Sequence, residues 1–145
     1  MDRIKVKPLK ILSLKDGDLF KMIDRNCSEF SDFGEIYFSK INHRAVKAWK
    51  KHKEMTLNLA VPVGAVRFIF FDDRNKSEVS IQEIVVGELD YKLITVPPGI
   101  WFGFQGLSLS TSLVANCASI VHSDPEVERI SHEDARFIPF SWEKA

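Results

Sequence analysis

The sequence predicts an all-β domain, a small closed barrel with little helix. About eight to ten short apolar segments recur at a spacing of roughly 8 to 12 residues, with turn-forming residues between them. Segments with a helical pattern are scarce. The 145 residues, 45% of them hydrophobic and 28% charged, fit one soluble globular domain with a core of its own. We expect an arm and loop over residues 1–34, and the barrel with a C-terminal packing segment over residues 35–142.

The N-terminal elements have weak patterns. Residues 4–14 alternate apolar and polar side chains but are interrupted at Pro8, which predicts an edge strand or an arm. After a turn at residues 15–18, Asp18 can cap a short helix at residues 19–23.

The barrel strands follow from residue 35 onward. Residues 57–63 and 66–71 are predicted to form a hairpin about Gly64. Val66, Phe68 and Phe70 should face the interior together with the region of Leu93 and Val96. Further strands are predicted at residues 35–42, 80–86, 92–96, 101–104 and 112–120, with one helical turn within residues 125–130. The aromatic tail, residues 137–142, should pack on the core or on a second subunit.

Charge and cysteine content exclude several classes of protein. Twenty basic and twenty acidic residues leave no net field to attract nucleic acid or an anionic membrane. No apolar run approaches the roughly 18 residues of a membrane helix, and the N-terminus lacks the apolar core of a signal peptide, so we expect a cytoplasmic protein. Cys27 and Cys117 lie far apart and have no Cys-x-x-Cys partner, which argues against a zinc site and a disulfide framework.

Two spaced motifs resemble those of the cupin barrels. The first cupin motif is His-x-His, four residues, Glu, six residues and Gly; the second is Pro-x-Gly, two residues and His. Lys50-Lys51-His52 is followed at those intervals by Leu57 and Gly64, and the second motif reads Pro97-Pro98-Gly99-Ile100-Trp101-Phe102. The resemblance implies a jelly-roll-like cupin barrel. One imidazole among the four ligand positions cannot hold a divalent ion, so neither metal nor cofactor is expected.

Metal-free cupins include the dTDP-4-dehydrorhamnose 3,5-epimerases and the dTDP-sugar 3,4-ketoisomerases, and residues 35–142 resemble this group. Residues 47–50, Lys-Ala-Trp-Lys, stand where the epimerases have Arg-Gly-Leu-His. Residues 64–74, which end in Phe71-Asp72-Asp73-Arg74, resemble the epimerase strand that ends in Asp-x-Arg. Residues 97–104 resemble its Pro-x-Gly-x-x-His-Gly-Phe, and residues 124–130 its Pro-Glu-x-Glu-x-x-Ile.

The resemblance also implies catalytic positions. The epimerase histidine falls on Lys50, the lysine near Leu57 and the tyrosine near Ala115, so double epimerisation is not expected. His52 matches the second histidine of the ketoisomerases and is the first candidate for the base, with Asp134 at the place of the aspartate that orients the histidine. Lys50 could act as a base only if burial lowered its pKa by several units.

Each binding candidate also has a plain structural reading. His52 could be a polar residue at the barrel mouth. Lys47 and Lys50 could form a solvated face, or hold a diphosphate while Trp49 stacks on a base or sugar. Trp101 and Phe104 could be core or ligand platform, and Asn58 and Asn116 could line a pocket because a buried amide needs partners.

Three function classes therefore compete. The first is an isomerase or epimerase that acts on a dTDP- or UDP-linked keto sugar in deoxysugar or surface-polysaccharide biosynthesis. The second is a cupin that binds such a sugar without catalysis. The third is a structural or interaction module. In each case a homodimer is expected, because an arm and an aromatic tail invite reciprocal packing.

Overall fold

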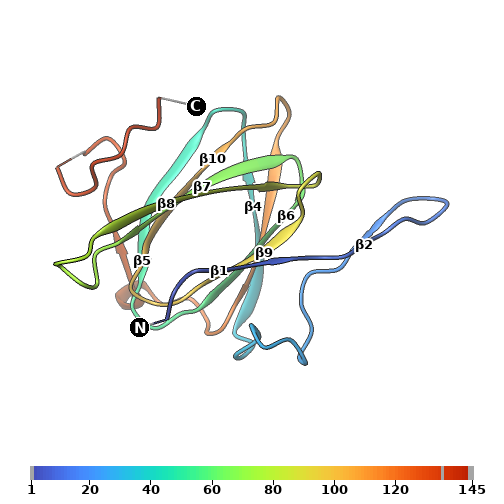
Figure 1. Cartoon of the computed structure of the whole chain (residues 1–145), viewed down its shortest axis with the longest axis horizontal. Helices are drawn as coiled ribbons and strands as arrows, with labels where there is room; N and C mark the ends of the chain where they lie inside the picture. The colour runs from blue at the N-terminus through green and yellow to red at the C-terminus, as the bar shows by residue number, and fades with distance from the viewer. Residues whose placement is uncertain (1, 135, 144–145) are drawn as a thin grey trace.

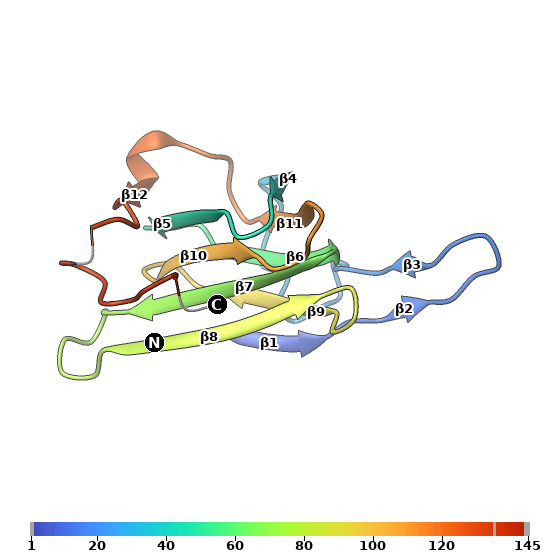
Figure 2. The ribbon, with the colours of Figure 1, turned by 90° about the horizontal axis from the view of Figure 1, so that it is seen from above.

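The chain folds into two five-stranded antiparallel sheets that face each other (Figures 1 and 2). The computed structural model describes residues 2–134 and 136–143. The first sheet has the order β1 (Lys5–Pro8), β9 (Lys92–Val96), β6 (Leu57–Val63), β11 (Ser112–Ala118) and β4 (Glu35–Ile41). The second has the order β12 (Val127–Arg129), β5 (Val46–His52), β10 (Trp101–Gly106), β7 (Ala65–Asp72) and β8 (Ser80–Gly87). This jelly-roll-like arrangement confirms the predicted all-β fold.

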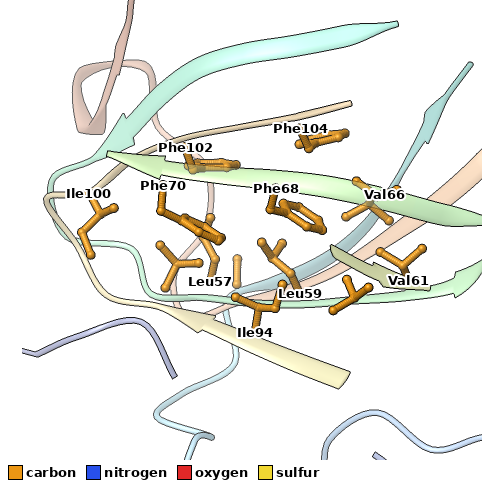
Figure 3. Close-up of a cluster of buried hydrophobic side chains, with 14 of the residues drawn as sticks. Leu57, Leu59, Val61, Val66, Phe68, Phe70, Ile94, Ile100, Phe102 and Phe104 are labelled. Carbon is orange, nitrogen blue, oxygen red and sulfur yellow. The ribbon is translucent and has the colours of Figure 1, made fainter. Parts of the chain in front are cut away.

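Side chains that alternate along the strands fill the space between the sheets. Val66, Phe68 and Phe70 of β7 are buried and belong to the interior cluster, as predicted. Figure 3 shows them with Phe102 and Phe104 of β10, facing residues of β6 and β9. The expectation for β9 was half wrong. Ile94 and Val96 belong to the interior cluster, so Leu93, although fully buried, lies on the opposite face of the strand.

The predicted hairpin of residues 57–63 and 66–71 is wrong. The two segments form β6 and β7, which belong to different sheets, and β7 pairs instead with β8. The chain crosses between the sheets at Gly64, which has a φ of +81° and where a Cβ would lie 2.2 Å from Ser112 Oγ. A hairpin turn and a corner between sheets both need glycine here, so the local sequence cannot distinguish them.

The outer face of the second sheet is also buried. Five residues of β5, β7 and β10 that face away from the interior (Trp49, Arg67, Ile69, Phe71 and Trp101) are at most 7% exposed. Ile138 and Trp142 of the C-terminal segment cover this face and belong to its apolar cluster. The tail therefore packs on its own barrel, which is one of the two placements that the sequence predicts.

The N-terminal segment begins on the barrel and then leaves it. β1 pairs with β9 at the edge of the first sheet, as expected for a strand that ends at Pro8. Beyond it, β2 (Ile11–Leu12) and β3 (Leu19–Phe20) form a two-stranded arm that projects away from the barrel (Figures 1 and 2). The helix predicted at residues 19–23 is wrong, because β3 satisfies its backbone groups by pairing with β2 and the Phe20 ring packs on Tyr91.

Helix is confined to a 3-10 turn, η1 (Asp124–Glu126), in the part of the chain that the structure describes. It overlaps the start of the helical turn expected within residues 125–130. No helix of that part is long and apolar enough to cross a membrane. The cytoplasmic location stays a prediction.

Candidate functional site

A cavity of about 480 Å³ opens between the two sheets. The first sheet contributes side chains of β4, β6 and β11, and the second sheet those of β5, β10 and the segment from β12 onward. Its apolar lining includes Leu59, Phe102, Phe104 and Val114. Its polar lining consists of Tyr37, Ser39, Lys47, Lys50, Asn116, Arg129 and Ser131. The described residues that line the cavity thus include three cations and no carboxylate.

A bulge in β5 directs two lysines into this cavity. Phe102 of β10 pairs with Lys50 and the next residue, Gly103, pairs with Ala48, so Trp49 is an extra residue on β5. Gly103 permits this close pairing, since a Cβ there would lie 2.3 Å from the Ala48 Cβ. Lys47 and Lys50 consequently both line the cavity, although their spacing does not fit simple alternation.

The cations influence one another. Burial is the largest cause that lowers the pKa of the Lys50 ammonium below its ordinary value of 10.5, and the charges of Arg129 and Lys47 lower it further. Lys47 Nζ donates a hydrogen bond to the carbonyl oxygen of Lys40 at 2.7 Å. A cavity with this charge is suited to an anionic ligand, and the lowered pKa makes the Lys50 ammonium easier to convert to a neutral amine than a lysine in water.

His52 does not line the cavity. Its Nδ1 lies 2.6 Å from Glu126 Oε1, and its ring stacks on Phe102 with centroids 6.0 Å apart. The other carboxylate oxygen, Oε2, accepts hydrogen bonds from the backbone N–H groups of Glu54 at 3.0 Å and Met55 at 2.8 Å. Burial by itself would raise the pKa of Glu126, but these hydrogen bonds hold it below its ordinary value of 4.5. The His52–Glu126 pair fastens η1 to the turn after β5.

These contacts bear on the expected histidine base and on the aspartate expected to orient it. His52 lies buried outside the cavity lining, and Glu126 rather than Asp134 contacts its ring. Asp134 pairs with Arg136 instead, whose hydrogen bonds lower the pKa of that carboxyl to about 2. The spacing of the sequence motifs suggested that His52 and Asp134 both lie near the site. What they contact is decided by the direction of β5 and by the path of the C-terminal segment.

Strand alternation separates the predicted binding residues into two groups. Phe104 and Asn116 line the cavity together with Lys47 and Lys50. Asn58 does not, because Leu57, Leu59 and Val61 occupy the inward positions of β6. Its amide oxygen accepts from Thr95 Oγ1 at 2.6 Å and its nitrogen donates to the Glu29 carbonyl at 3.1 Å.

The two tryptophans lie largely on the outer face. Trp101 belongs to the cluster covered by the tail, and the Lys51 ammonium lies 4.8 Å from the centroid of its ring. Trp49 is 2% exposed and packs on Trp142, with ring centroids 5.2 Å apart, although part of it reaches the cavity wall. Both rings are therefore largely covered by the outer cluster and the tail, and their role as a platform for a nucleobase or sugar stays a prediction.

The sequence did not indicate four polar residues of the cavity lining, namely Tyr37, Ser39, Arg129 and Ser131, and the first and third of these matter most for the site. Tyr37 lies on β4, and its hydroxyl accepts a hydrogen bond from Asn116 Nδ2 at 2.8 Å. Arg129 lies on β12, within the segment that resembles Pro-Glu-x-Glu-x-x-Ile. The alternation of Tyr37, Ser39 and Ile41 could have indicated an inward face, but nothing local shows that β4 lies beside β11.

No family model matches the chain. A solved structure of a dTDP sugar isomerase from Desulfovibrio desulfuricans G20 is 39% identical, covers 98% of this chain and 92% of that one, and superposes with a TM-score of 0.93. The "probable low-salt glycan biosynthesis epimerase Agl13" of Haloferax volcanii is 28% identical over 136 residues, which is 90% of this chain and 87% of that protein. A dTDP-6-deoxy-D-glucose-3,5-epimerase from Legionella pneumophila, solved with dTDP-4-keto-L-rhamnose, shares the fold at 17% identity, with a TM-score of 0.79 and coverage of 92% of this chain and 76% of that one.

Proposed function

The chain belongs to the family of dTDP-sugar isomerases and 3,5-epimerases, and from this premise we propose that it binds a dTDP-linked keto sugar in the cavity between its sheets and moves a proton next to the ketone. The observation that carries the proposal is the charge of the cavity, with three cations, no carboxylate among its described lining residues, and an apolar floor. A diphosphate would be held by Lys47 and Arg129, and the sugar ring would lie over Phe102 and Phe104.

Lys50 is the proposed base. Its ammonium lines the cavity, and although Lys50 as a whole keeps much of its surface exposed, desolvation there lowers its pKa, so a larger fraction of it is neutral amine near neutral pH than for a lysine surrounded by water. A neutral amine can take a proton from a carbon next to a ketone, and the electron pair of the broken C–H bond then passes through the enolate to the carbonyl oxygen. A positioned base of this kind contributes about 10² to 10⁴ in rate.

Binding tests the first half of the proposal. Calorimetry with dTDP should detect binding. UDP titrated in parallel should show whether the site prefers the thymine or the uracil nucleotide. Lys47→Met should weaken dTDP binding about 10-fold or more, because a charge-assisted hydrogen bond is lost. Lys51→Met is a matched control, since Lys51 lies on the same strand but pairs with Glu128 on the outer face at 2.9 Å. If neither dTDP nor UDP binds, the chain is a structural or interaction module.

Proton exchange tests the second half. A panel of dTDP-linked 4-keto-6-deoxyhexoses that includes dTDP-4-keto-L-rhamnose should gain solvent deuterium at a carbon next to the ketone, as followed by NMR. Lys50→Met should abolish this exchange and retain dTDP binding, and Lys51→Met should leave both unchanged. If wild-type protein binds dTDP but exchanges no carbon-bound hydrogen over hours, the chain is a binding module without catalysis.

A homodimer is part of the proposal. The arm formed by β2 and β3 projects from the barrel and exposes Leu12, Leu14 and Leu19 by 49%, 56% and 46%. Apolar side chains on a projecting hairpin are stabilised when a second copy covers them. The C-terminal tail contributes less to this expectation than the sequence predicts, since its Ile138 and Trp142 are buried on their own barrel.

A further inference from the structure

Tyr37 faces the cavity because of its place in β4. Tyr37 and Ser39 line the cavity and Ile41 belongs to the interior cluster, whereas Ile36 and Phe38 are 53% and 62% exposed on the other face. The β4 strand lies in the first sheet and Lys50 lies in the second. The phenol and the amine therefore belong to opposite walls of one cavity.

Asn116 fixes the phenol and leaves a polar atom for a ligand. Asn116 is 3% exposed, and its Nδ2 donates to the Tyr37 hydroxyl oxygen. Its Oδ1 is buried and has no hydrogen-bond partner among the described residues. A buried acceptor without a donor is costly, so a ligand hydroxyl in the cavity would satisfy it. An amide that bonds to Tyr37 and to a sugar hydroxyl would set their relative position.

The phenol carries its proton at neutral pH. Burial is the largest cause that raises the pKa of Tyr37 above its ordinary value of 10.0, and it outweighs the hydrogen bond from Asn116, which lowers it. Because Asn116 donates to the phenol oxygen, the O–H hydrogen is free to point toward a ligand. Tyr37 is thus a protonated phenol on the cavity wall opposite that of Lys50.

We infer that Tyr37 is the proton donor opposite Lys50, and that the reaction inverts a single carbon next to the ketone of the sugar. This inference rests on the proposed function. The Lys50 amine takes the hydrogen as a proton, and the C–H electron pair forms the enolate. The enolate then takes the proton of the Tyr37 O–H at the same carbon but on the opposite face. The resulting phenolate and ammonium regain their starting states by exchanging protons with water, so no oxidant or reductant is needed.

This arrangement accounts for the residues at the positions that the family resemblance indicates. The expected tyrosine position falls near Ala115, whose neighbours Val114 and Asn116 line the cavity. The side chain that β11 places there is therefore an amide, and it binds a tyrosine of the adjacent strand β4. Ketoisomerisation, in which the carbonyl moves to a neighbouring ring carbon, would not need an acid on the wall opposite the base. Inversion of a carbon needs both groups, so it fits the placement of Lys50 and Tyr37 better.

The test uses Tyr37→Phe, with Tyr91→Phe as its matched control, since Tyr91 packs on Phe20 of the arm and does not line the cavity. Both variants should bind dTDP as wild type does, which also verifies that they fold. With the 4-keto sugar panel in deuterated water, Tyr37→Phe should lower formation of the inverted product about 100-fold or more. Deuterium should still enter the recovered sugar, because Lys50 can remove and return a proton on its own face.

Three results would contradict the inference. Tyr37→Phe could form product at the wild-type rate, or it could lose exchange together with product although it binds dTDP. The wild-type product could have a displaced carbonyl and no inverted carbon, which NMR of the product would reveal without any variant. The failure of the proposed function has a different signature, since wild-type protein would then either not bind dTDP or bind it without exchanging carbon-bound hydrogen.

Discussion

Replacement of Glu126 tests whether the His52–Glu126 pair is structural. The carboxylate receives three hydrogen bonds, from His52 Nδ1 at 2.6 Å, Met55 N at 2.8 Å and Glu54 N at 3.0 Å. Glu126→Ala leaves the buried imidazole and the buried Met55 N–H without an acceptor. The loss of one partner of a buried pair costs about 3 to 5 kcal/mol. Glu126→Gln keeps one oxygen, so it should cost about 1 to 3 kcal/mol.

Urea unfolding at neutral pH measures these costs as changes in the free energy of unfolding. Glu128→Gln is the control on the adjacent strand, because Glu128 is a half-exposed partner of Lys51 and should cost less than about 1 kcal/mol. The pH dependence adds a second measurement. Because the folded-state pKa of Glu126 is lowered, its stabilising contribution is present above its ordinary value of 4.5 and is lost as the pH falls through the folded-state value. In Glu126→Gln the free energy of unfolding should therefore depend less on pH in this acidic range.

The refuting result is a mismatch between stability and catalysis. If Glu126→Ala costs less than about 1 kcal/mol but abolishes deuterium exchange, then the pair is a catalytic dyad, and His52 rather than Lys50 is the base. If both variants lose stability as expected and Glu126→Gln retains exchange, the pair fastens the C-terminal segment and Lys50 stays the proposed base.

Four further outcomes are expected. Phe68→Ala should cost about 3 to 5 kcal/mol in urea unfolding, because Phe68 is fully buried against Phe104 with ring centroids 5.4 Å apart; a cost below about 1 kcal/mol would contradict the interior assignment. The rate of deuterium exchange should rise with pH to a plateau that begins below pH 10.5, because burial lowers the pKa of Lys50 and the neutral amine is the base; a rate that falls over this range would contradict it. Sedimentation at micromolar concentration should give a dimer, and Leu14→Glu on the arm should shift it toward monomer; a wild-type monomer would refute the proposed contact. Metal analysis of purified protein should find no stoichiometric iron, zinc or manganese. Of the residues at the four metal-ligand positions of the cupin motifs, only His52 has a side chain that commonly binds metal, and a bound metal would overturn this prediction.

The local pattern of the sequence determined the strands and much of the core. Alternating apolar residues and turn residues predicted most strands close to their observed limits, because period-two burial and turn chemistry are properties of neighbouring residues. The inward direction of Phe68 followed from the same alternation. The family membership could also be anticipated, since the motifs around Lys50 and Pro97 keep the spacing of the barrel even where the side chains differ.

Contacts between distant segments were decided by the tertiary structure alone. Gly64 makes a corner between sheets rather than a hairpin, because β7 finds its partner in β8. The bulge at Trp49 turns Lys50 inward and Trp49 outward, and it depends on the pairing of β5 with β10. Tyr37 meets Asn116 across 79 positions of the chain, and Glu126 meets His52 across 74. Sequence alternation assigns a side chain to a face of a strand, whereas the order of strands in the two sheets decides which faces share a cavity.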